Sequence, residues 1–398
     1  MKPETRTAFA EVAALEERYQ LATYKKMPIV AERGEGVWLY TNDGRRYLDL
    51  YGGHAVAGTG HSHPRVVAAI QAQSEQLLFY SNLVYSAARA RAAEKLVAIA
   101  PESLTKAFFC NSGTEANENA MRMARMATDR TNIITFSGGF HGRTADAISA
   151  TFLGKYRDIG KPNVPGHLQA EFGDIESVRA LADDKVAAIM LEPIQSMAGV
   201  RLAEPAFYRA LRELCDARGI VLIYDEVQTG VGRTGEWFFA GSQAGDGVVP
   251  DIVTLAKALG SGIPVGACLV TEEIASHIKE NDLGTTFGGG MIAMAAATAT
   301  LEAIEQDGML ANVRQVETYL RERLKAVKQV VSVRGLGFLL GLQFSDQAAP
   351  IHKALLDRQI ITGTSSDRNV LRLLPPLCLQ RQEVDLFVEA LGEVLSQL

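Results

Sequence analysis

The sequence predicts an α/β protein with a large domain built on a mostly parallel sheet, followed by a small α+β C-terminal domain. Two observations carry this prediction. Between about residues 105 and 270, short apolar segments alternate with glycine-rich or polar loops and helical segments, as in a parallel sheet. After about residue 280 the pattern changes to long helical segments around a hairpin. The 398 residues are also too many for one small core.

The first hundred residues are expected to form a helix, a hairpin and two further helices. We expect residues 1–45 to pack with the small domain, because their hairpin lies outside the alternating region. Asn42-Asp43-Gly44 is a hairpin turn, and Pro64 is placed to begin a helix. The expected helices are 6–20, 64–78 and 87–99, and the expected strands are 29–30, 36–40 and 46–50.

The large domain is expected over residues 46–280 and the small domain over residues 281–398. In the large domain, the expected strands are 106–110, 132–136, 186–191, 219–224, 251–255 and 265–270, and the helices include 115–128, 174–183 and 205–218. In the small domain, the expected helices are 291–306, 309–329, 350–358 and 382–397, with a hairpin of strands 330–333 and 337–344.

Composition favours a soluble, intracellular globular protein. The net charge is −6 and no basic run is present, so nucleic acid is not an expected partner. The four cysteines lie far apart without a C-x-x-C pair, which argues against a zinc site or a disulfide framework. They fit a reducing cytoplasm. No apolar run reaches membrane-spanning length, and no apolar signal core follows Met1, so we expect a cytoplasmic protein.

Lys257 stands in an unusually apolar stretch. From Ile252 to Thr271 no other residue is charged, so this lysine either reaches the surface or is buried. Burial disfavours the ammonium form and makes the amine a nucleophile. One stable outcome is an imine with a carbonyl cofactor such as pyridoxal phosphate (PLP). Taken alone, the stretch favours a structural lysine. A catalytic lysine requires that other strand ends carry residues that would bind the same cofactor.

The first of these strand ends carries small residues. Asn111, Ser112, Gly113 and Thr114 follow the strand ending at residue 110 and open a helix. Free N–H groups and the positive end of the helix dipole make such a turn a phosphate site. The alternative is an ordinary helix cap with Glu115 in the first turn.

The next strand end holds an aromatic, a histidine and an arginine between glycines. Phe140 is placed to stack on a flat cofactor, and Arg143 to pair with a carboxylate, with His141 between them. The alternative is an exposed turn with a solvated arginine.

Carboxylates follow two further strands. Glu192 comes after residues 186–191, and Asp225-Glu226 after residues 219–224. A carboxylate at the end of a buried strand needs a positive partner, either Mg²⁺ or a protonated pyridine nitrogen. No G-x-x-x-x-G-K-[ST] loop accompanies Asp225 to complete a nucleotide site. Together the strand ends suit PLP better than a nucleotide or a metal.

The chain resembles the class III (ω-amino) aminotransferases, which belong to the fold type I PLP enzymes. The resemblance covers nearly the whole chain and implies a mostly parallel, seven-stranded sheet. The motifs that carry it are residues 60–64, 111–118, 140–144, 192–195, 225–230, 232–235, 250–252, 257–260, 285–289 and 333–337.

Within this family the chain is most similar to the acetylornithine and succinylornithine aminotransferase branch. Residues 47–56, 79–82 and 371–377 carry this similarity. It implies transfer of the δ-amino group of N2-acetylornithine or N2-succinylornithine to 2-oxoglutarate, giving an N-acyl glutamate semialdehyde and glutamate in arginine biosynthesis. Ornithine, 4-aminobutyrate, a carrier-bound lysine, or the chemistry of a PLP aminomutase remain alternatives.

The resemblance also implies roles for individual residues. Lys257 would form the imine with PLP and later move a proton, and Asp225 would hold the pyridine nitrogen. Further cofactor contacts would come from Ser112, Gly113, Thr114, Phe140, Glu192, Val227 and Gln228. Thr286 would reach the phosphate of a neighbouring subunit in a homodimer. Substrate contacts would come from Tyr24, Arg143, Thr285 and Arg372, with Arg143 and Arg372 binding carboxylates.

Two positions depart from the family pattern. Where the family has Glu-Pro-Ile-Gln-Gly-Glu, residues 192–197 end in Ser196-Met197. The missing glutamate normally pairs with the arginine at the position of Arg372, so we expect Arg372 to be free for a second acidic group. Where the family has Gly-Gly-Asn-Pro, this chain has Gly290-Met291 at its end, which we expect to loosen the following helix and lower cofactor affinity.

Overall fold

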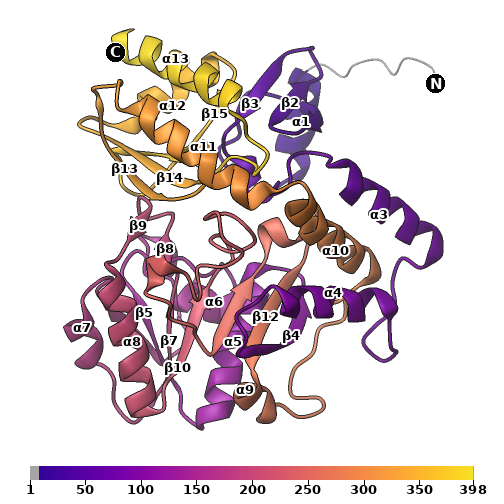
Figure 1. The fold of residues 1–398 in the computed structure, drawn as a ribbon, viewed down its shortest axis with the longest axis vertical. Coiled ribbons are helices and arrows are strands. Elements are labelled where there is room, and N and C mark those ends of the chain that lie inside the picture. Colours follow the sequence, from indigo (N-terminus) through magenta and orange to yellow (C-terminus); the bar gives the residue numbers. More distant parts are fainter. Residues whose placement is uncertain (1–8, 398) are drawn as a thin grey trace.

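A computed structural model describes residues 9–397 and contains a seven-stranded sheet with two four-stranded sheets at one end of the molecule (Figure 1). The large sheet has the order β4-β12-β11-β10-β7-β5-β6. β12 runs antiparallel to both of its neighbours, and the other pairs are parallel. The strands are β4 (Leu104–Cys110), β5 (Asn132–Phe136), β6 (His167–Ala170), β7 (Val186–Leu191), β10 (Val221–Asp225), β11 (Ile252–Leu255) and β12 (Gly266–Thr271). This arrangement confirms the predicted fold class.

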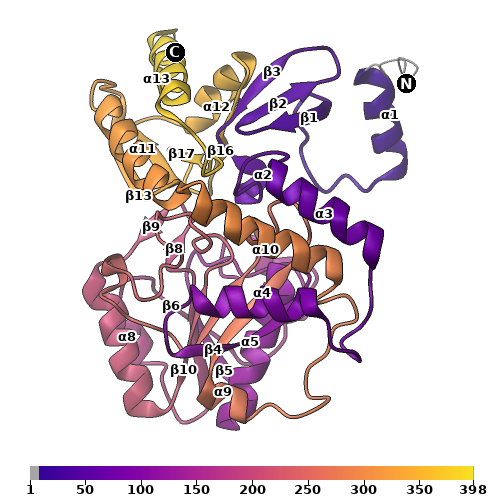
Figure 2. The ribbon, with the colours of Figure 1, turned by 45° about the vertical axis from the view of Figure 1, so that its right-hand side comes forward.

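Helices cover both faces of the large sheet. Ile223 faces α5 (Gly113–Thr128), whereas the next residue, Tyr224, packs against Tyr208 of α8 (Pro205–Arg218). Successive side chains of a strand point to opposite faces, and here both faces are buried. That explains why β7, and β10 up to Tyr224, are uninterrupted apolar runs. α4 (Ala87–Ala98) and α10 (Met291–Gln306) contact each other, with α10 also against α3 (Pro64–Gln76) (Figure 2).

The N-terminal hairpin and the C-terminal part of the chain share a sheet. β15 (Ile360–Ile361) pairs in parallel with β3 (Arg46–Asp49), which continues into β2 (Trp38–Thr41) and β1 (Ala31–Glu35) (Figure 1). The other small sheet has the order β13-β14-β17-β16, formed by β13 (Val330–Leu336), β14 (Leu339–Phe344), β17 (Val370–Leu373) and β16 (Gly363–Thr364). The domain boundaries at residues 45 and 280 stay predictions.

The remaining elements are short or lie on the outside of these sheets. None of the helices within residues 9–397 is long and apolar enough to cross a membrane. The elements are α1 (Phe9–Tyr19), α2 (Gly52–Ala55), α6 (Ala145–Ser149), α7 (Ile175–Arg179), α9 (Glu272–Ser276), α11 (Met309–Leu324), α12 (Ala348–Asp357), α13 (Arg381–Gln397), β8 (Ile194–Gln195) and β9 (Arg201–Leu202).

Some predicted elements were wrong at the edges of the fold. The strand predicted at 29–30 lies instead at Ala31–Glu35, a mostly exposed segment without an apolar signal. The strand β6 was missed in the residue pattern, because it is a short strand at the edge of the sheet. The first helix was predicted from residue 6, and its residues 6–8 lie outside the described part of the chain.

Three further boundaries moved for local reasons. The helix predicted to residue 329 ends at Leu324, and the buried Val327 belongs to a turn. The helix predicted over 174–183 covers only Ile175–Arg179. Strand β13 continues through Gly335, whose φ of 90° and close approach to the Leu339 carbonyl exclude a side chain.

Candidate active site

The predicted strand-end residues meet at one edge of the large sheet. β4, β5, β7, β10 and β11 run in the same direction, so their carboxyl ends lie together. In open α/β sheets, ligands bind outside this edge. Lys257, which follows β11, has Asp225 and Glu192 as its electrostatic neighbours. The residues singled out after separate strands therefore form one site.

Lys257 begins the short 3-10 helix Lys257–Gly260, two residues after β11 ends. Its φ of 45° is rare for a residue with a side chain and is typical of functional sites. Burial lowers the pKa of the Lys257 ammonium, and nearby Arg372 lowers it further, while Asp225 and Glu192 oppose this effect. Of the two interpretations of the apolar stretch, the structure therefore favours a buried lysine over one that reaches the surface.

Asp225 is the last residue of β10, and 4% of its surface is exposed. Its Oδ2 accepts hydrogen bonds from Asn117 Nδ2 and His141 Nδ1, each at 2.8 Å. Its Oδ1 accepts one from the Val227 backbone N–H at 3.1 Å. These donors hold the carboxylate in one orientation at the sheet edge.

Asn117 and His141 were not predicted as site residues. Asn117 lies one turn into α5, and its Oδ1 accepts from Thr254 Oγ1 at 2.6 Å, which ties α5 to β11. His141 has a fully buried ring whose Nε2 has no partner among the described residues. His141 stood in the noted loop beside Phe140, but the sequence gives no sign that it faces Asp225.

Helix α5 begins directly after β4, and Ser112 is its N-cap. Ser112 caps the helix by accepting from the Glu115 N–H at 3.3 Å. A side chain at Gly113 would approach Val227 Cγ1 to 2.7 Å, so glycine lets the helix end lie against the loop after β10. Thr114 Oγ1 and Thr144 Oγ1 are 2.6 Å apart.

The loop after β5 places Phe140 and Arg143 against Tyr156. The rings of Phe140 and Tyr156 meet edge to face with centroids 5.7 Å apart. The Arg143 guanidinium carbon lies 4.5 Å from the centroid of the Tyr156 ring, a cation–π contact. Arg143 is otherwise exposed. Tyr156 was missed by sequence reasoning, because it begins a short 3-10 helix, Tyr156–Asp158, without a recognisable pattern.

Glu192 joins this loop to β7. Its Oε1 accepts from the Phe140 backbone N–H at 2.9 Å. Burial, with the charge of Asp225 added to it, raises the pKa of Glu192 to about 7. The carboxyl group therefore holds Phe140 in place at the sheet edge.

Arg372 lies in β17 with 5% of its surface exposed. Its Nε donates to the Thr364 carbonyl at 2.7 Å, its Nη1 to Ser196 Oγ at 3.0 Å and its Nη2 to the Tyr51 hydroxyl at 2.6 Å. All three acceptors are neutral. Within residues 9–397, Arg372 has no ion pair with a carboxylate. Its charge is thus buried without a carboxylate partner among the described residues, although a buried charge is normally paired.

Gln228 contacts His54, which is near both Lys257 and Arg372. Gln228 Nε2 donates to the His54 carbonyl at 3.3 Å. The pKa of His54 is lowered by burial and by the charges of Arg372 and Lys257, so this imidazole is close to both. His54 belongs to the noted Gly52-Gly53-His54 segment, but no role was predicted for it.

The remaining predicted residues are less clearly placed. Thr285 Oγ1 accepts from Asn111 Nδ2 at 3.1 Å, beside the α5 turn. Thr286 is exposed. Tyr24 is 71% exposed and has no hydrogen bond or ring contact with the described residues. The structure of one chain therefore does not bring Tyr24 or Thr286 to Lys257.

The two departures from the family pattern have different surroundings. The Met197 carbonyl accepts a hydrogen bond from the Ser366 N–H at 2.8 Å. Because the side chain of methionine has no carboxylate, this position cannot pair with Arg372. Gly290 is the N-cap of α10 without a side-chain cap, and a Cβ there would lie 3.0 Å from the Phe287 carbonyl. The expected loss of cofactor affinity stays a prediction.

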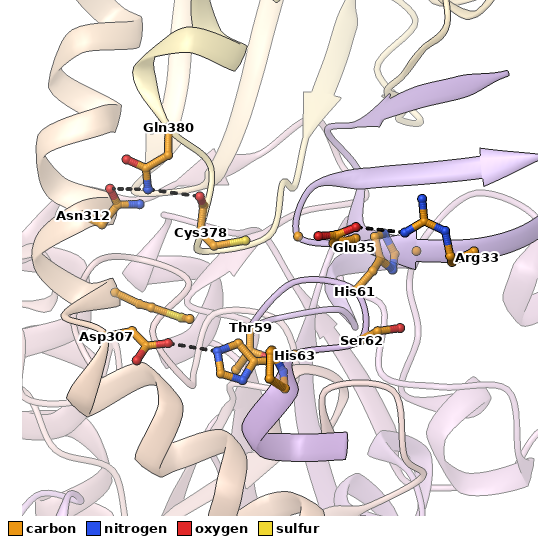
Figure 3. A pocket seen from close by; sticks show the side chains of 14 residues that line it. Arg33, Glu35, Thr59, His61, Ser62, His63, Asp307, Asn312, Cys378 and Gln380 are labelled. Atoms are coloured by element: carbon orange, nitrogen blue, oxygen red, sulfur yellow. Dashed lines mark hydrogen bonds and ion pairs between the residues drawn. The ribbon is translucent and has the colours of Figure 1, made fainter. Parts of the chain in front are cut away.

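A separate cavity of about 800 Å³ lies between the N-terminal hairpin and the start of α11 (Figure 3). None of the predicted site residues lines it. Its polar side chains contact one another, as in Arg33 with Glu35 and His63 with Asp307 (Figure 3). This self-pairing leaves Lys257, Asp225 and Arg372 as the better candidates for chemistry.

Comparisons with known proteins agree with this geometry. The family described as Aminotransferase class-III matches residues 19–395. An acetylornithine aminotransferase of Methanocaldococcus jannaschii is 40% identical over 96% of this chain and 98% of its own length. An acetylornithine aminotransferase of Archaeoglobus fulgidus is 41% identical over 94% of this chain and 97% of its own.

Solved structures of similar proteins have the same fold. The ornithine aminotransferase of Toxoplasma gondii superposes with a TM-score of 0.90 at 26% identity, covering 98% of this chain and 95% of its own. The acetylornithine aminotransferase of Elizabethkingia anophelis gives a TM-score of 0.86 at 26% identity, with 98% and 100% coverage.

Proposed function

Because the chain belongs to the class III aminotransferases, which are PLP-dependent enzymes, we propose that it transfers the δ-amino group of an Nα-acylated ornithine to 2-oxoglutarate. The donor is N2-acetylornithine or N2-succinylornithine, and the products are the N-acyl glutamate semialdehyde and glutamate. This reaction places the protein in arginine biosynthesis. The observation that carries the proposal is that Lys257 lies close to Asp225 and Glu192 at the edge of the large sheet, with Arg372 of β17 also near enough to affect it.

The residues at this edge fit PLP. The α5 N-terminus, with Ser112, Gly113 and Thr114, offers free N–H groups to the phosphate. Phe140 offers a ring face, and Asp225 offers a buried, oriented carboxylate to the pyridine nitrogen. Glu192, Val227 and Gln228 complete the proposed surroundings.

When bound, PLP supplies the electron sink that allows the C–H bond beside the transferred amine to break. Lys257 is the proposed covalent anchor, and its lowered pKa leaves the amine able to take up and return a proton. Asp225, held by Asn117 and His141, would direct its carboxylate toward the pyridine nitrogen.

Two arginines are proposed to orient the substrates. Arg143 binds the α-carboxylate of the acylated ornithine, with Thr285 nearby, and so directs the δ-amine toward Lys257. Arg372 binds a carboxylate of 2-oxoglutarate or glutamate. Because Arg372 has no carboxylate partner among residues 9–397, it also accepts an acidic acyl arm, which a succinyl group has and an acetyl group lacks.

We also propose a homodimer in which Thr286 reaches the phosphate of the neighbouring site. Thr286 is exposed, and so is its neighbour Phe287. Apolar side chains are exposed over the segment before α4, at Leu77, Leu78, Tyr80, Leu83, Val84 and Tyr85, and Phe79 in that segment contacts Phe287. A surface of this kind is typical of an interface. Tyr24 is the proposed contact with substrate in this assembly.

We further propose a cytoplasmic location, which the four unpaired cysteines support.

A half-reaction screen tests the proposed function. The holoenzyme is mixed separately with acetylornithine, succinylornithine, ornithine and 4-aminobutyrate while the PLP absorbance is followed. We expect rapid change with one or both acylated ornithines, followed by recovery on adding 2-oxoglutarate. A faster reaction with ornithine or 4-aminobutyrate would overturn the donor, and turnover without 2-oxoglutarate would indicate an aminomutase.

The Arg372→Ala variant tests the acyl preference. If Arg372 binds an acidic arm, this variant loses more activity with succinylornithine than with acetylornithine, and it also slows the 2-oxoglutarate half-reaction. An equal loss for both donors with an unchanged 2-oxoglutarate half-reaction would contradict the assignment.

A further inference from the structure

Arg372 has hydrogen-bond donors to spare. A guanidinium carries five N–H groups. Three of them donate to Thr364, Ser196 and Tyr51. One N–H on each of Nη1 and Nη2 therefore remains for a ligand, and two N–H groups of one guanidinium can bind a carboxylate together.

The two hydroxyl groups beside Arg372 also retain their protons. Tyr51 and Ser196 accept from the guanidinium through their oxygens. Among the residues that the structure describes, neither hydroxyl donates to an acceptor. Burial raises the pKa of Tyr51, so its hydroxyl is protonated at neutral pH and able to donate. Two O–H donors thus flank the two free N–H donors.

Both hydroxyls are held in place by their surroundings. A Cβ on Gly363 would lie 1.9 Å from Tyr51 Cε2, so the tyrosine ring lies directly against the backbone of β16. The Tyr51 ring also lies in a T-shaped contact with His54, with centroids 4.9 Å apart. Ser196 is fully buried, and its carbonyl accepts from the Val200 N–H at 3.2 Å. Donors fixed in this way bind without first losing side-chain freedom.

We propose that Tyr51 and Ser196 are substrate-binding residues that donate, together with Arg372, to a single substrate carboxylate. The four donors match the lone pairs of the two carboxylate oxygens. This inference rests on the proposed function and specifies its substrates as dicarboxylates, namely the five-carbon oxo acid and a donor with an acidic acyl arm. No protein carboxylate within residues 9–397 competes for this site, so it is open in both half-reactions.

Binding of glutarate, an unreactive five-carbon dicarboxylate, tests the inference directly. Calorimetry with the holoenzyme compares wild type with Tyr51→Phe, Ser196→Ala and the double variant. Each lost hydrogen bond to a charged group is expected to weaken binding by about 10-fold, and both losses together by about 100-fold. The KM for 2-oxoglutarate should rise in parallel while kcat with saturating substrate changes less.

Two control variants separate binding from folding. Tyr319→Phe removes a tyrosine hydroxyl that donates to Asp385 elsewhere in the small domain, and it should leave glutarate affinity unchanged. Ser196→Thr keeps a hydroxyl and should bind more tightly than Ser196→Ala. Glutarate binding does not depend on the identity of the amine donor, so its outcome is independent of the half-reaction screen.

The proposal is overturned if Tyr51→Phe and Ser196→Ala bind glutarate within about twofold of wild type, a change below that of a charged hydrogen bond. A lower Tm with unchanged affinity would show that the hydroxyls only support Arg372. If only one of the two variants bound glutarate more weakly, the other residue would not be a substrate-binding residue.

Discussion

The edge of the seven-stranded sheet and the region around Arg372 each keep a charged side chain away from solvent, but they satisfy its charge differently. At the sheet edge, both oxygens of Asp225 accept hydrogen bonds from the protein. Around Arg372, neutral acceptors take only part of the donor capacity of the guanidinium. The protein itself satisfies the charge in the first region, whereas we propose that a ligand carboxylate does so in the second.

Replacing Lys257 should produce the largest effect. In Lys257→Ala, the covalent anchor and the proton-carrying amine are both lost, so we expect kcat to fall by about 10³-fold or more. Steady-state turnover and the yellow colour of the bound cofactor are measured together. Lys328→Ala, at an exposed lysine, is the matched control. Retention of both colour and turnover in Lys257→Ala would contradict the account.

Replacing Asp225 tests whether its charge, rather than its shape, matters at the sheet edge. Asp225→Asn keeps the size of the side chain but removes the charge that we propose for contact with the ring nitrogen. Loss of a charge-assisted hydrogen bond, about 3 kcal/mol, predicts a fall in kcat of about 10²-fold. PLP content is determined separately, so that cofactor loss and slower chemistry are distinguished. A kcat close to wild type at full PLP content would show that Asp225 is only structural.

Glu226, the residue after Asp225, is a buried carboxylate for which we propose no catalytic role. Its carboxylate accepts from the backbone N–H groups of Phe239 at 2.7 Å and Ala240 at 2.8 Å, away from Asp225. Burial raises the pKa of Glu226 to about 7, against 4.5 for an exposed glutamate. The folded state therefore binds the proton more tightly, and the stability that this gives is lost as pH rises from about 4.5 to about 7.

The pH dependence of unfolding tests this contrast. Over that interval, wild type should lose up to about 3 kcal/mol more stability than Glu226→Gln, which cannot titrate. Denaturant unfolding at several pH values gives the difference, and kcat serves as the control, which should stay within about twofold. Identical pH profiles for the two proteins would show that Glu226 does not titrate in this range.

Tyr156 should produce the smallest effect. Tyr156→Leu removes the ring beneath Arg143, a contact worth about 0.5–1 kcal/mol at an exposed site, and should raise the donor KM by two- to fivefold. Tyr156→Phe keeps the ring and should behave as wild type. If both variants showed the same KM change, the hydroxyl rather than the cation–π contact would be responsible.

The comparison also explains how much of the site was predictable. Lys257, Asp225 and Glu192 were found because strand ends are visible as local apolar runs, and parallel strands bring their ends together. The fold class followed from the same alternation. The edge strand β6 has only four residues and no apolar run, so the sequence pattern did not predict it.

The residues around Arg372 come from distant parts of the chain. Tyr51 is 321 positions from Arg372 and Ser196 is 176 positions away, so no local pattern links them. His141 and Asn117 were missed for a similar reason, because packing of α5 and the loop after β5 directs them toward Asp225. Tyr24 and Thr286 were proposed from resemblance alone, and a single chain leaves them exposed.

The central claim is that Lys257 is the covalent anchor of PLP. Borohydride reduction of the holoenzyme makes the link between cofactor and protein permanent, and peptide mass spectrometry then identifies the modified lysine. We expect one pyridoxyl group per chain, on the peptide that contains Lys257. A pyridoxyl group on another lysine, or an unmodified Lys257 peptide from fully PLP-loaded enzyme, would contradict the account.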